Sequence, residues 1–436
     1  MFRSLSAIPL PLALCCALVA CAPSADENTK VLVLTYQPDL KRYDRAPVQL
    51  KTIDDIVTLE GSVAKVIGRA EMDLTKPVKS LFLDEGGDVK VDLIDVDGVL
   101  VPADFHSLNM VTAYYNLERS VLFFEESGLD RVEFGKRNLY YFPKVLMPSP
   151  SDTSPDGYET TEMKDNAFFS SAIDGFAVLP FDEFQALPLA INLGVMGHEF
   201  THAVFDHLVC GLGDCYISDP MMTSNETVNA MSALNEGLAD FMGAAITCGE
   251  NMDACDPAFM EHSMSASLAS SRDISKQHCY PPKVQSGDAT VTINQQVMQG
   301  PTDVFSLKGY AYRLGSVVAS ALYAAVQRLG VNNPLNWRRV STGILDALKD
   351  EKMGGIRQLY LQELTTGGDF IVPRASHLNL STALNAIASK IADNQVKDAV
   401  CGAFMDHFGY TKNELPSCDG VASFGMCAQK SNGGAL

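Results

Sequence analysis

The chain has 436 residues, of which 47% are hydrophobic and 20% are charged, and its formal net charge at pH 7 is −20. This composition excludes a disordered or fibrous chain and is sufficient for two or three domains with apolar cores. The acidic balance argues against binding to nucleic acid or anionic lipid, because both are negatively charged and require a basic surface.

The first twenty residues, MFRSLSAIPLPLALCCALVA, contain one basic residue followed by an apolar run. This pattern is typical of a signal peptide (residues 1–20), because the run is too short and wrongly flanked for a membrane-spanning helix. It leads into Leu18-Val19-Ala20-Cys21, which resembles the lipobox of bacterial lipoproteins. The resemblance implies a lipid anchor on Cys21, a polar tether over residues 21–28 and an outer-membrane location. An ordinary cleaved signal, with secretion of the chain, is the alternative.

Residues 29–102 predict a small β-rich N-terminal domain. The stretches KVLVLTY, DIVTLEGSVAKVIG and VKVDLIDVDGVLV are rich in β-branched residues, and Gly-Gly and Asp-Gly turns interrupt them. No residues in this region form a recognisable catalytic pattern.

From residue 103 the pattern changes to that of an α+β protein. The stretch SLNMVTAYYNLERSVLFFEESG has apolar residues at helical spacing and ends at a glycine, and strand-like pieces follow it. After residue 187 the pattern is mainly helical.

Eight cysteines follow residue 205, and their even number in an exported chain predicts disulfides. Spacing along the chain favours Cys210–Cys215 and Cys248–Cys255 but does not determine the other pairs. None of the eight belongs to a C-x-x-C motif, which argues against a cysteine zinc knuckle. They are Cys210, Cys215, Cys248, Cys255, Cys279, Cys401, Cys418 and Cys427.

Residues 197–205, GHEFTHAVF, place two histidines four residues apart after an apolar run. On an α-helix, His198 and His202 share one face and can offer imidazole nitrogens to one metal ion. Glu199 would then be placed to accept a proton from a water on zinc. The alternative is a buried helix whose histidines are satisfied by other partners.

Residues 235–243, NEGLADFMG, add three polar residues to a second apolar helical stretch. A lone buried carboxylate is unfavourable, whereas a metal ion would account for Glu236 as its third protein ligand. Asp240 and Asn235 could each accept the second N–H of a ligating histidine. A capped or surface carboxylate pair is the alternative.

The two motifs together, H-E-x-x-H and N-E-x-x-x-D, resemble the thermolysin-like zinc metallopeptidases, or gluzincins. The resemblance implies one zinc ion held by His198, His202 and Glu236, with Glu199 as general base. It implies an α/β half at residues 103–205 and a helical half with disulfides at residues 206–430, with the zinc between them. The spacing between the motifs is longer than in thermolysin and contains two cysteines. The acidic residues of the family's calcium site are not visible, so calcium is not supported.

Three further stretches extend the resemblance. DNAFF at 165–169 is similar to the edge strand that holds substrate in this family, which implies contacts at Asn166 and Ala167. SSRDISKQ at 270–277 is similar to the segment that carries the family's substrate-binding arginine, here Arg272. The family's oxyanion histidine has no counterpart, and Tyr312 takes the matching position, with Tyr310 nearby. The remaining candidates for that role are His262, His278, His377 and His407.

The sequence therefore predicts a zinc metallopeptidase that is exported, anchored to the membrane through lipid on Cys21 and active on proteins or peptides. A first alternative is a zinc-containing surface lipoprotein with weak or no turnover, which binds peptides or a partner protein. A second is a lipoprotein without metal. The sequence specifies neither the oligomeric state nor the side-chain preference for substrate.

Overall fold

The computed structural model describes residues 29–150, 158–181, 187–210, 225–249, 252, 255–263, 272–280, 285–286, 289–290, 304–349, 356–357, 379–425 and 427. The predicted signal segment, the lipobox cysteine Cys21 and the tether lie outside these residues, as do Cys215 and His377. Across the described ranges, no helix is both long enough and apolar enough to cross a bilayer.

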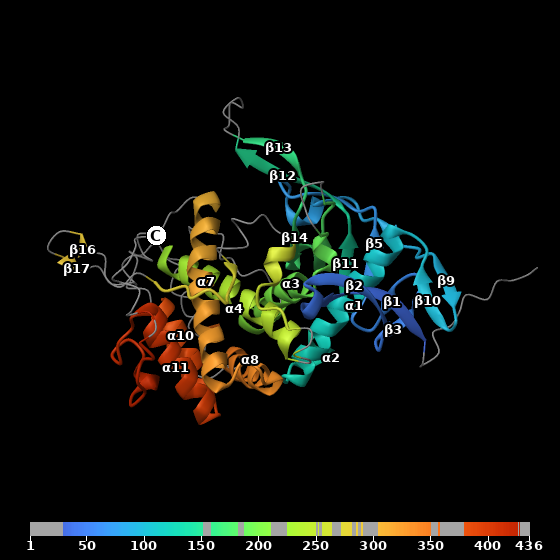
Figure 1. Ribbon diagram of the computed structural model, residues 1–436. Helices are drawn as coiled ribbons and strands as arrows, with labels where there is room; N and C mark the ends of the chain where they lie inside the picture. The colour runs from blue at the N-terminus through green and yellow to red at the C-terminus, as the bar shows by residue number, and fades with distance from the viewer. Residues whose placement is uncertain are drawn as a thin grey trace, which may run out of the picture.

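The first half of the chain forms three β-sheets, which Figure 1 shows in blue to green. The first has the order β2-β1-β10-β9, from β1 (Lys30–Gln37), β2 (Arg42–Gln49), β9 (Leu93–Val96) and β10 (Val99–Pro102). The second has the order β14-β15-β11-β5-β4-β3, from β3 (Ile53–Asp55), β4 (Glu60–Gly61), β5 (Ala64–Gly68), β11 (Arg137–Tyr141), β14 (Ala167–Ser170) and β15 (Gly175–Val178), and β8 (Gly87–Asp88) pairs with β5. The third has the order β13-β12-β6-β7, from β6 (Glu71–Asp73), β7 (Phe82–Asp84), β12 (Lys144–Pro150) and β13 (Tyr158–Met163).

Helices predominate in the second half, where the described strands are the short β16 (Gln285–Ser286) and β17 (Ala289–Thr290). Figure 1 shows α7, α10 and α11 on the side of the molecule away from β9 and β10, with α3 and α4 between. The predicted α+β fold, with a β-rich first part and a helical second part, is confirmed. The helices are α1 (Phe105–Glu126), α2 (Arg131–Phe134), α3 (Leu193–Phe205), α4 (Asn225–Cys248), α7 (Val304–Leu329), α8 (Pro334–Lys349), α10 (Leu380–Lys390) and α11 (Asn394–Phe408).

Strands from both sides of residue 102 share two of the sheets. β5 pairs in parallel with β11, which in turn pairs in parallel with β15, and β6 pairs in parallel with β12. Residues 29–102 thus contribute strands to the sheet that ends in β14. Deleting them would remove β5 from the middle of that sheet and leave β11 hydrogen-bonded on one side only, to β15.

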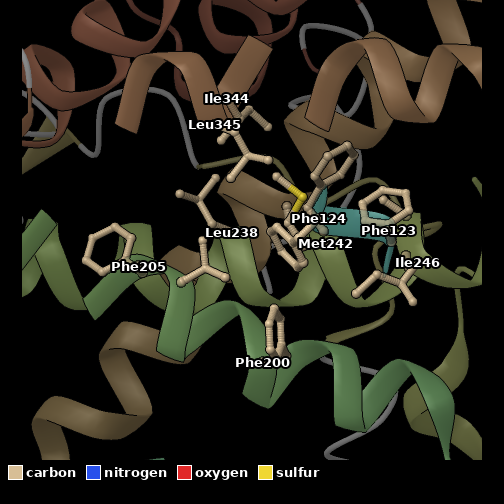
Figure 2. Packing of buried hydrophobic residues seen from close by; sticks show 14 of the residues in the cluster. Phe123, Phe124, Phe200, Phe205, Leu238, Met242, Ile246, Ile344 and Leu345 are labelled. Atoms are coloured by element: carbon tan, nitrogen blue, oxygen red, sulfur yellow. The ribbon is translucent and has the colours of Figure 1, made fainter. Parts of the chain in front are cut away.

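Helix α3 lies at the centre of the apolar core. It begins after Asn192, whose side-chain oxygen accepts hydrogen bonds from the backbone N–H groups of Gly194 and Val195. On its buried face, Phe200 packs against Phe124 of α1, with ring centroids 5.3 Å apart. Figure 2 shows this packing together with residues of α4 and α8, so α3 is held by apolar neighbours from several elements.

Disulfides join elements of the helical half. The predicted pair Cys248–Cys255 is confirmed, and Cys279–Cys427 and Cys401–Cys418 are two further pairs. Cys210 is also disulfide-bonded. The predicted Cys210–Cys215 pair stays a prediction, since Cys215 lies outside the described residues.

Helices α4 and α7 approach closely where two glycines face each other. A Cβ atom built on Gly237 would lie 2.6 Å from the backbone oxygen of Gly315 and 2.6 Å from Cβ of Val318. Backbone atoms and a β-carbon cannot relax by a change of rotamer. A residue larger than glycine would therefore push the helices apart. Glu236 directly precedes this contact.

We predict that Gly237→Ala destabilises the protein although alanine favours helix. The propensity gain of about 1 kcal/mol is outweighed by an overpacking cost of about 1–3 kcal/mol. Urea unfolding followed by circular dichroism measures the difference, with Ser316→Ala on α7 as a control that removes only a bond to the Tyr312 carbonyl. A more stable Gly237→Ala variant would show that the helices can separate without loss.

Candidate metal centre

Two imidazoles on α3 face each other across one helical turn. The Nε2 atoms of His198 and His202 are 3.0 Å apart, and the two side chains are 5% and 15% exposed. The apolar faces of α3 are buried in the core, so these histidines are presented together on one side of the helix. The prediction that His198 and His202 share one face of the helix is confirmed.

Helix α4 brings a carboxylate to the same place. Oε2 of Glu236 lies 3.6 Å from Nε2 of His198, and Oε1 lies 3.9 Å from Nε2 of His202. The ligand atoms of the three residues all lie within 4.8 Å of one another. The structure therefore places the three predicted ligands in one group that could hold a metal ion.

The outer nitrogens of both imidazoles face oxygen acceptors. Nδ1 of His202 lies 3.0 Å from Oδ1 of Asn235. Nδ1 of His198 lies 2.9 Å from Oδ1 of Asp240, although the contact lacks the angle of a well-formed hydrogen bond. With hydrogen on each Nδ1, toward these oxygen acceptors, the neutral rings would direct the lone pairs of their Nε2 atoms inward.

The group fits a zinc ion. Two inward lone pairs 3.0 Å apart repel each other unless a cation lies between them. Two imidazole nitrogens on one tetrahedral zinc ion lie about 3.3 Å apart, which is close to the separation found. Two neutral imidazoles and one carboxylate form the donor set of a catalytic zinc site with an open position.

Glu199 lies beside the candidate ligands and is 8% exposed. Its Oε2 accepts a hydrogen bond of 3.1 Å from the backbone N–H of Phe169 in β14. Burial raises the pKa of Glu199 to about 7, and the nearby charge of Glu236 contributes in the same direction. A carboxyl group with a pKa near neutrality can both accept and donate a proton at physiological pH.

Strand β14 forms an edge of the second sheet among the described strands. It pairs with β15 in antiparallel register, with Ala167 opposite Val178. The exposed Asn166 precedes it and accepts a backbone hydrogen bond from Leu179. The structure thus places the stretch predicted to contact substrate at a sheet edge, next to Glu199. The binding role itself stays a prediction.

Arg272 lies within the site and is 5% exposed. Its Nη2 is 2.6 Å from Oδ1 of Asp240 and 3.1 Å from Oε2 of Glu236, and its Nε is 3.1 Å from Oδ2 of Asp240. Nη2 also lies 3.5 Å from Nε2 of His198. Burial alone would lower the pKa of the guanidinium, but Asp240 and Glu236 raise it above its usual value. Arg272 therefore carries a permanent positive charge among the carboxylates.

Tyr312 of α7 packs beneath this guanidinium. The centre of the Arg272 guanidinium lies 4.5 Å from the centroid of the Tyr312 ring, a cation–π geometry. The negative charge of Glu236, followed by burial, raises the pKa of Tyr312 above its usual value, so its hydroxyl stays protonated and can donate. The side chain of Tyr310 lies outside the part of the chain that is described.

The other candidate histidines that the structure describes are engaged elsewhere. His262 bonds to Asp256 at 2.8 Å. His278 bonds to the carbonyl of Asp273, and His407 bonds to the carbonyl of His278. His377 lies outside the described residues. Among the described candidates, Tyr312 is therefore the one in contact with the group around Glu236.

Sequence reasoning missed two features of the site. One is the hydrogen bond from the N–H of Phe169 to Glu199, which a backbone group makes and which no residue type signals. The other is the pairing of Arg272 with Asp240, since the sequence motifs imply separate roles for the two residues. The common feature of both is long sequence separation, 30 and 32 residues.

Comparisons with known proteins find no matching family model and no similar curated protein. Among solved structures, the chain is similar to the precursor of protealysin, a metalloproteinase from Serratia proteamaculans. The two share 16% sequence identity with a TM-score of 0.44, over 82% of this chain and 90% of that chain. These values are too low to assign a family, so a function has to be argued from the geometry of the site.

We predict that zinc binds at one equivalent per chain and stabilises the fold. At a free zinc concentration a hundred times the Kd, the gain in unfolding free energy is about 2.7 kcal/mol. Isothermal titration gives the stoichiometry, and thermal unfolding with and without chelator gives the gain. His202→Ala should abolish both effects, while His106→Ala, an exposed histidine elsewhere, should leave them intact. An equal zinc effect in His202→Ala would place the ion at another site.

Proposed function

We propose that the protein is a zinc-dependent metallopeptidase with a thermolysin-like active site that hydrolyses peptide bonds in proteins or peptides. The observation that carries the proposal is the convergence of His198, His202 and Glu236 beside Glu199, next to a sheet edge. Each of these features alone is compatible with a purely structural role. Together they supply a metal donor set, a proton acceptor and a surface for an extended chain.

The first part of the proposal concerns proton transfer. His198, His202 and Glu236 would hold the zinc, which when bound activates water and polarises a carbonyl group. Glu199 accepts the proton of the attacking water and passes it to the nitrogen of the departing amine. Burial favours the protonated form of Glu199, which helps it to retain the proton until transfer, and the Phe169 N–H keeps one carboxylate oxygen directed toward β14.

The second part concerns how a substrate is held. An extended peptide can add to the edge of the second sheet by backbone hydrogen bonds to β14, which makes binding tolerant of sequence. We assign the contacts at the start of this strand to Asn166 and Ala167. The support for this assignment is that β14 is an edge strand and that Phe169, in the same strand, contacts Glu199 through its backbone N–H.

The third part concerns charge that develops on the substrate carbonyl. We assign its stabilisation to the protonated hydroxyl of Tyr312 and to the guanidinium of Arg272. The bonds of Arg272 to Asp240 and Glu236 run through Nε and Nη2, and Nη1 is the donor that we assign to substrate. The stacking of the two side chains supports a shared role.

The last part concerns location. We propose that the chain is exported and held at the outer membrane by lipid on Cys21. The support is the lipobox-like sequence together with disulfides, which form and persist in oxidising compartments. Secretion without an anchor, and a zinc-binding lipoprotein without turnover, are the outcomes that would replace parts of this proposal.

We predict that Glu199→Gln lowers kcat for a peptide substrate by about 10³-fold while one zinc per chain is retained, because the amide cannot accept a proton. Cleavage of unfolded casein and of a quenched fluorescent peptide measures the loss. Glu118→Gln is the control, since Glu118 is a buried carboxylate that bonds to Thr52. If the unmodified protein binds zinc but does not cleave either substrate, the alternative of a zinc-binding lipoprotein without turnover would be favoured over a peptidase.

We predict that Tyr312→Phe lowers kcat by about 10²-fold with little change in KM, because the lost donor acts on charge that develops in the transition state. Steady-state kinetics on the same peptide measures both constants. Tyr323→Phe is the matched control, because Tyr323 lies on the same helix and packs against Trp337. If Tyr312→Phe keeps full activity, the ring serves only to pack beneath Arg272.

A further inference from the structure

Arg272 is followed by residues 273–280, which form turns and irregular backbone, and we call residues 272–280 the arginine segment. A buried guanidinium that must meet two carboxylates and a substrate needs a backbone held to within a fraction of an ångström. The arginine segment contains His278 and is contacted by His407. Neither histidine has a part in the proposed chemistry.

The ring of His278 bonds back to the residue that follows Arg272. Its Nε2 lies 2.8 Å from the carbonyl oxygen of Asp273, which also accepts the backbone N–H of Lys276 at 3.1 Å. A carbonyl oxygen can only accept, so Nε2 of His278 carries hydrogen. The result is a closed turn directly beside Arg272.

His407 of α11 holds this turn from the other side. The residue is 1% exposed, and its Nδ1 lies 2.8 Å from the carbonyl oxygen of His278. Its own backbone oxygen accepts the N–H of Tyr280 at 2.8 Å. The peptide groups around His278 are thereby bound to one buried residue near the end of α11.

Two further contacts keep α7 and the end of the chain against the segment. Ser320 of α7 donates to the carbonyl of Lys276 at 3.0 Å and accepts the N–H of His278 at 3.1 Å. The disulfide Cys279–Cys427 links the segment to a residue 148 positions later. Helix α11 packs against α7, as Figure 1 shows, so these contacts belong to one unit.

We propose that His407 is a positioning residue for Arg272. It acts through the carbonyl of His278, whose ring holds Asp273, and so fixes the backbone from which Arg272 reaches Asp240. The relay consists of two histidine hydrogen bonds in series, each 2.8 Å long. The geometry of the relay is independent of the proposed peptidase activity, and only its effect on turnover rests on that activity.

Hydrogen exchange of the segment tests the relay without any assay of activity. In His407→Leu the donor is lost, and amides of residues 273–280 should exchange about fivefold faster in the folded protein. His407→Asn keeps an N–H near the position of Nδ1 and should restore near-normal exchange. Val396→Ala, at the start of the same helix, is the control for general destabilisation. Unchanged exchange in His407→Leu overturns the proposal.

A double-mutant cycle with Arg272→Gln tests the consequence for turnover. We expect His407→Leu to lower kcat/KM about tenfold in the unmodified background and less than about twofold when Arg272 is already replaced. Equal losses in both backgrounds would show that His407 acts on stability alone. Should His407→Leu fail to fold, His278→Leu removes the other bond of the relay and is compared with His278→Gln. If the unmodified protein does not cleave peptides, the exchange measurement decides alone.

Discussion

Buried charge between α3 and α4 is the central constraint on this structure. Glu199, Glu236 and Asp240 lie in a layer of apolar residues, where an uncompensated carboxylate is strongly unfavourable. Arg272 supplies one positive charge, and two inward imidazole lone pairs point to a place for a cation. A divalent ion would complete the compensation, which links the stability of the helical layer to metal binding.

This constraint explains why the surrounding packing is so close. Apolar side chains of α1, α3 and α4 pack in one core, and Figure 2 shows the phenylalanines of α1 and α3 beside α4. Exclusion of water raises the pKa of Glu199 and strengthens each electrostatic contact. The glycine contact of Gly237 with Gly315 brings α7, and with it Tyr312, against the same layer. The raised pKa of Glu199 and the position of Tyr312, which we propose serve catalysis, therefore both depend on close packing of this layer.

The two halves of the chain contribute differently to the site. The sheets present the edge strand β14, whose backbone contacts Glu199, and strands from residues 29–102 support that edge through β5. The helical half supplies Glu236 and, through a disulfide-linked C-terminal unit, the segment that carries Arg272. A sheet edge and a disulfide-linked helical unit that both contact the candidate metal group would suit the proposed function, which requires an extended chain to be held in register.

Features that depend on local spacing could be predicted from the amino-acid sequence. The four-residue interval between His198 and His202 places both on one helix face at 3.6 residues per turn, and the nearby cysteines predicted Cys248–Cys255. Alternation of β-branched stretches and helical periodicity predicted the α+β fold. The packed structure was needed to find that Arg272 pairs with Asp240 and that Cys279 bonds to Cys427. Contacts between distant residues arise when elements pack, and neither residue type nor periodicity specifies which partners packing brings together.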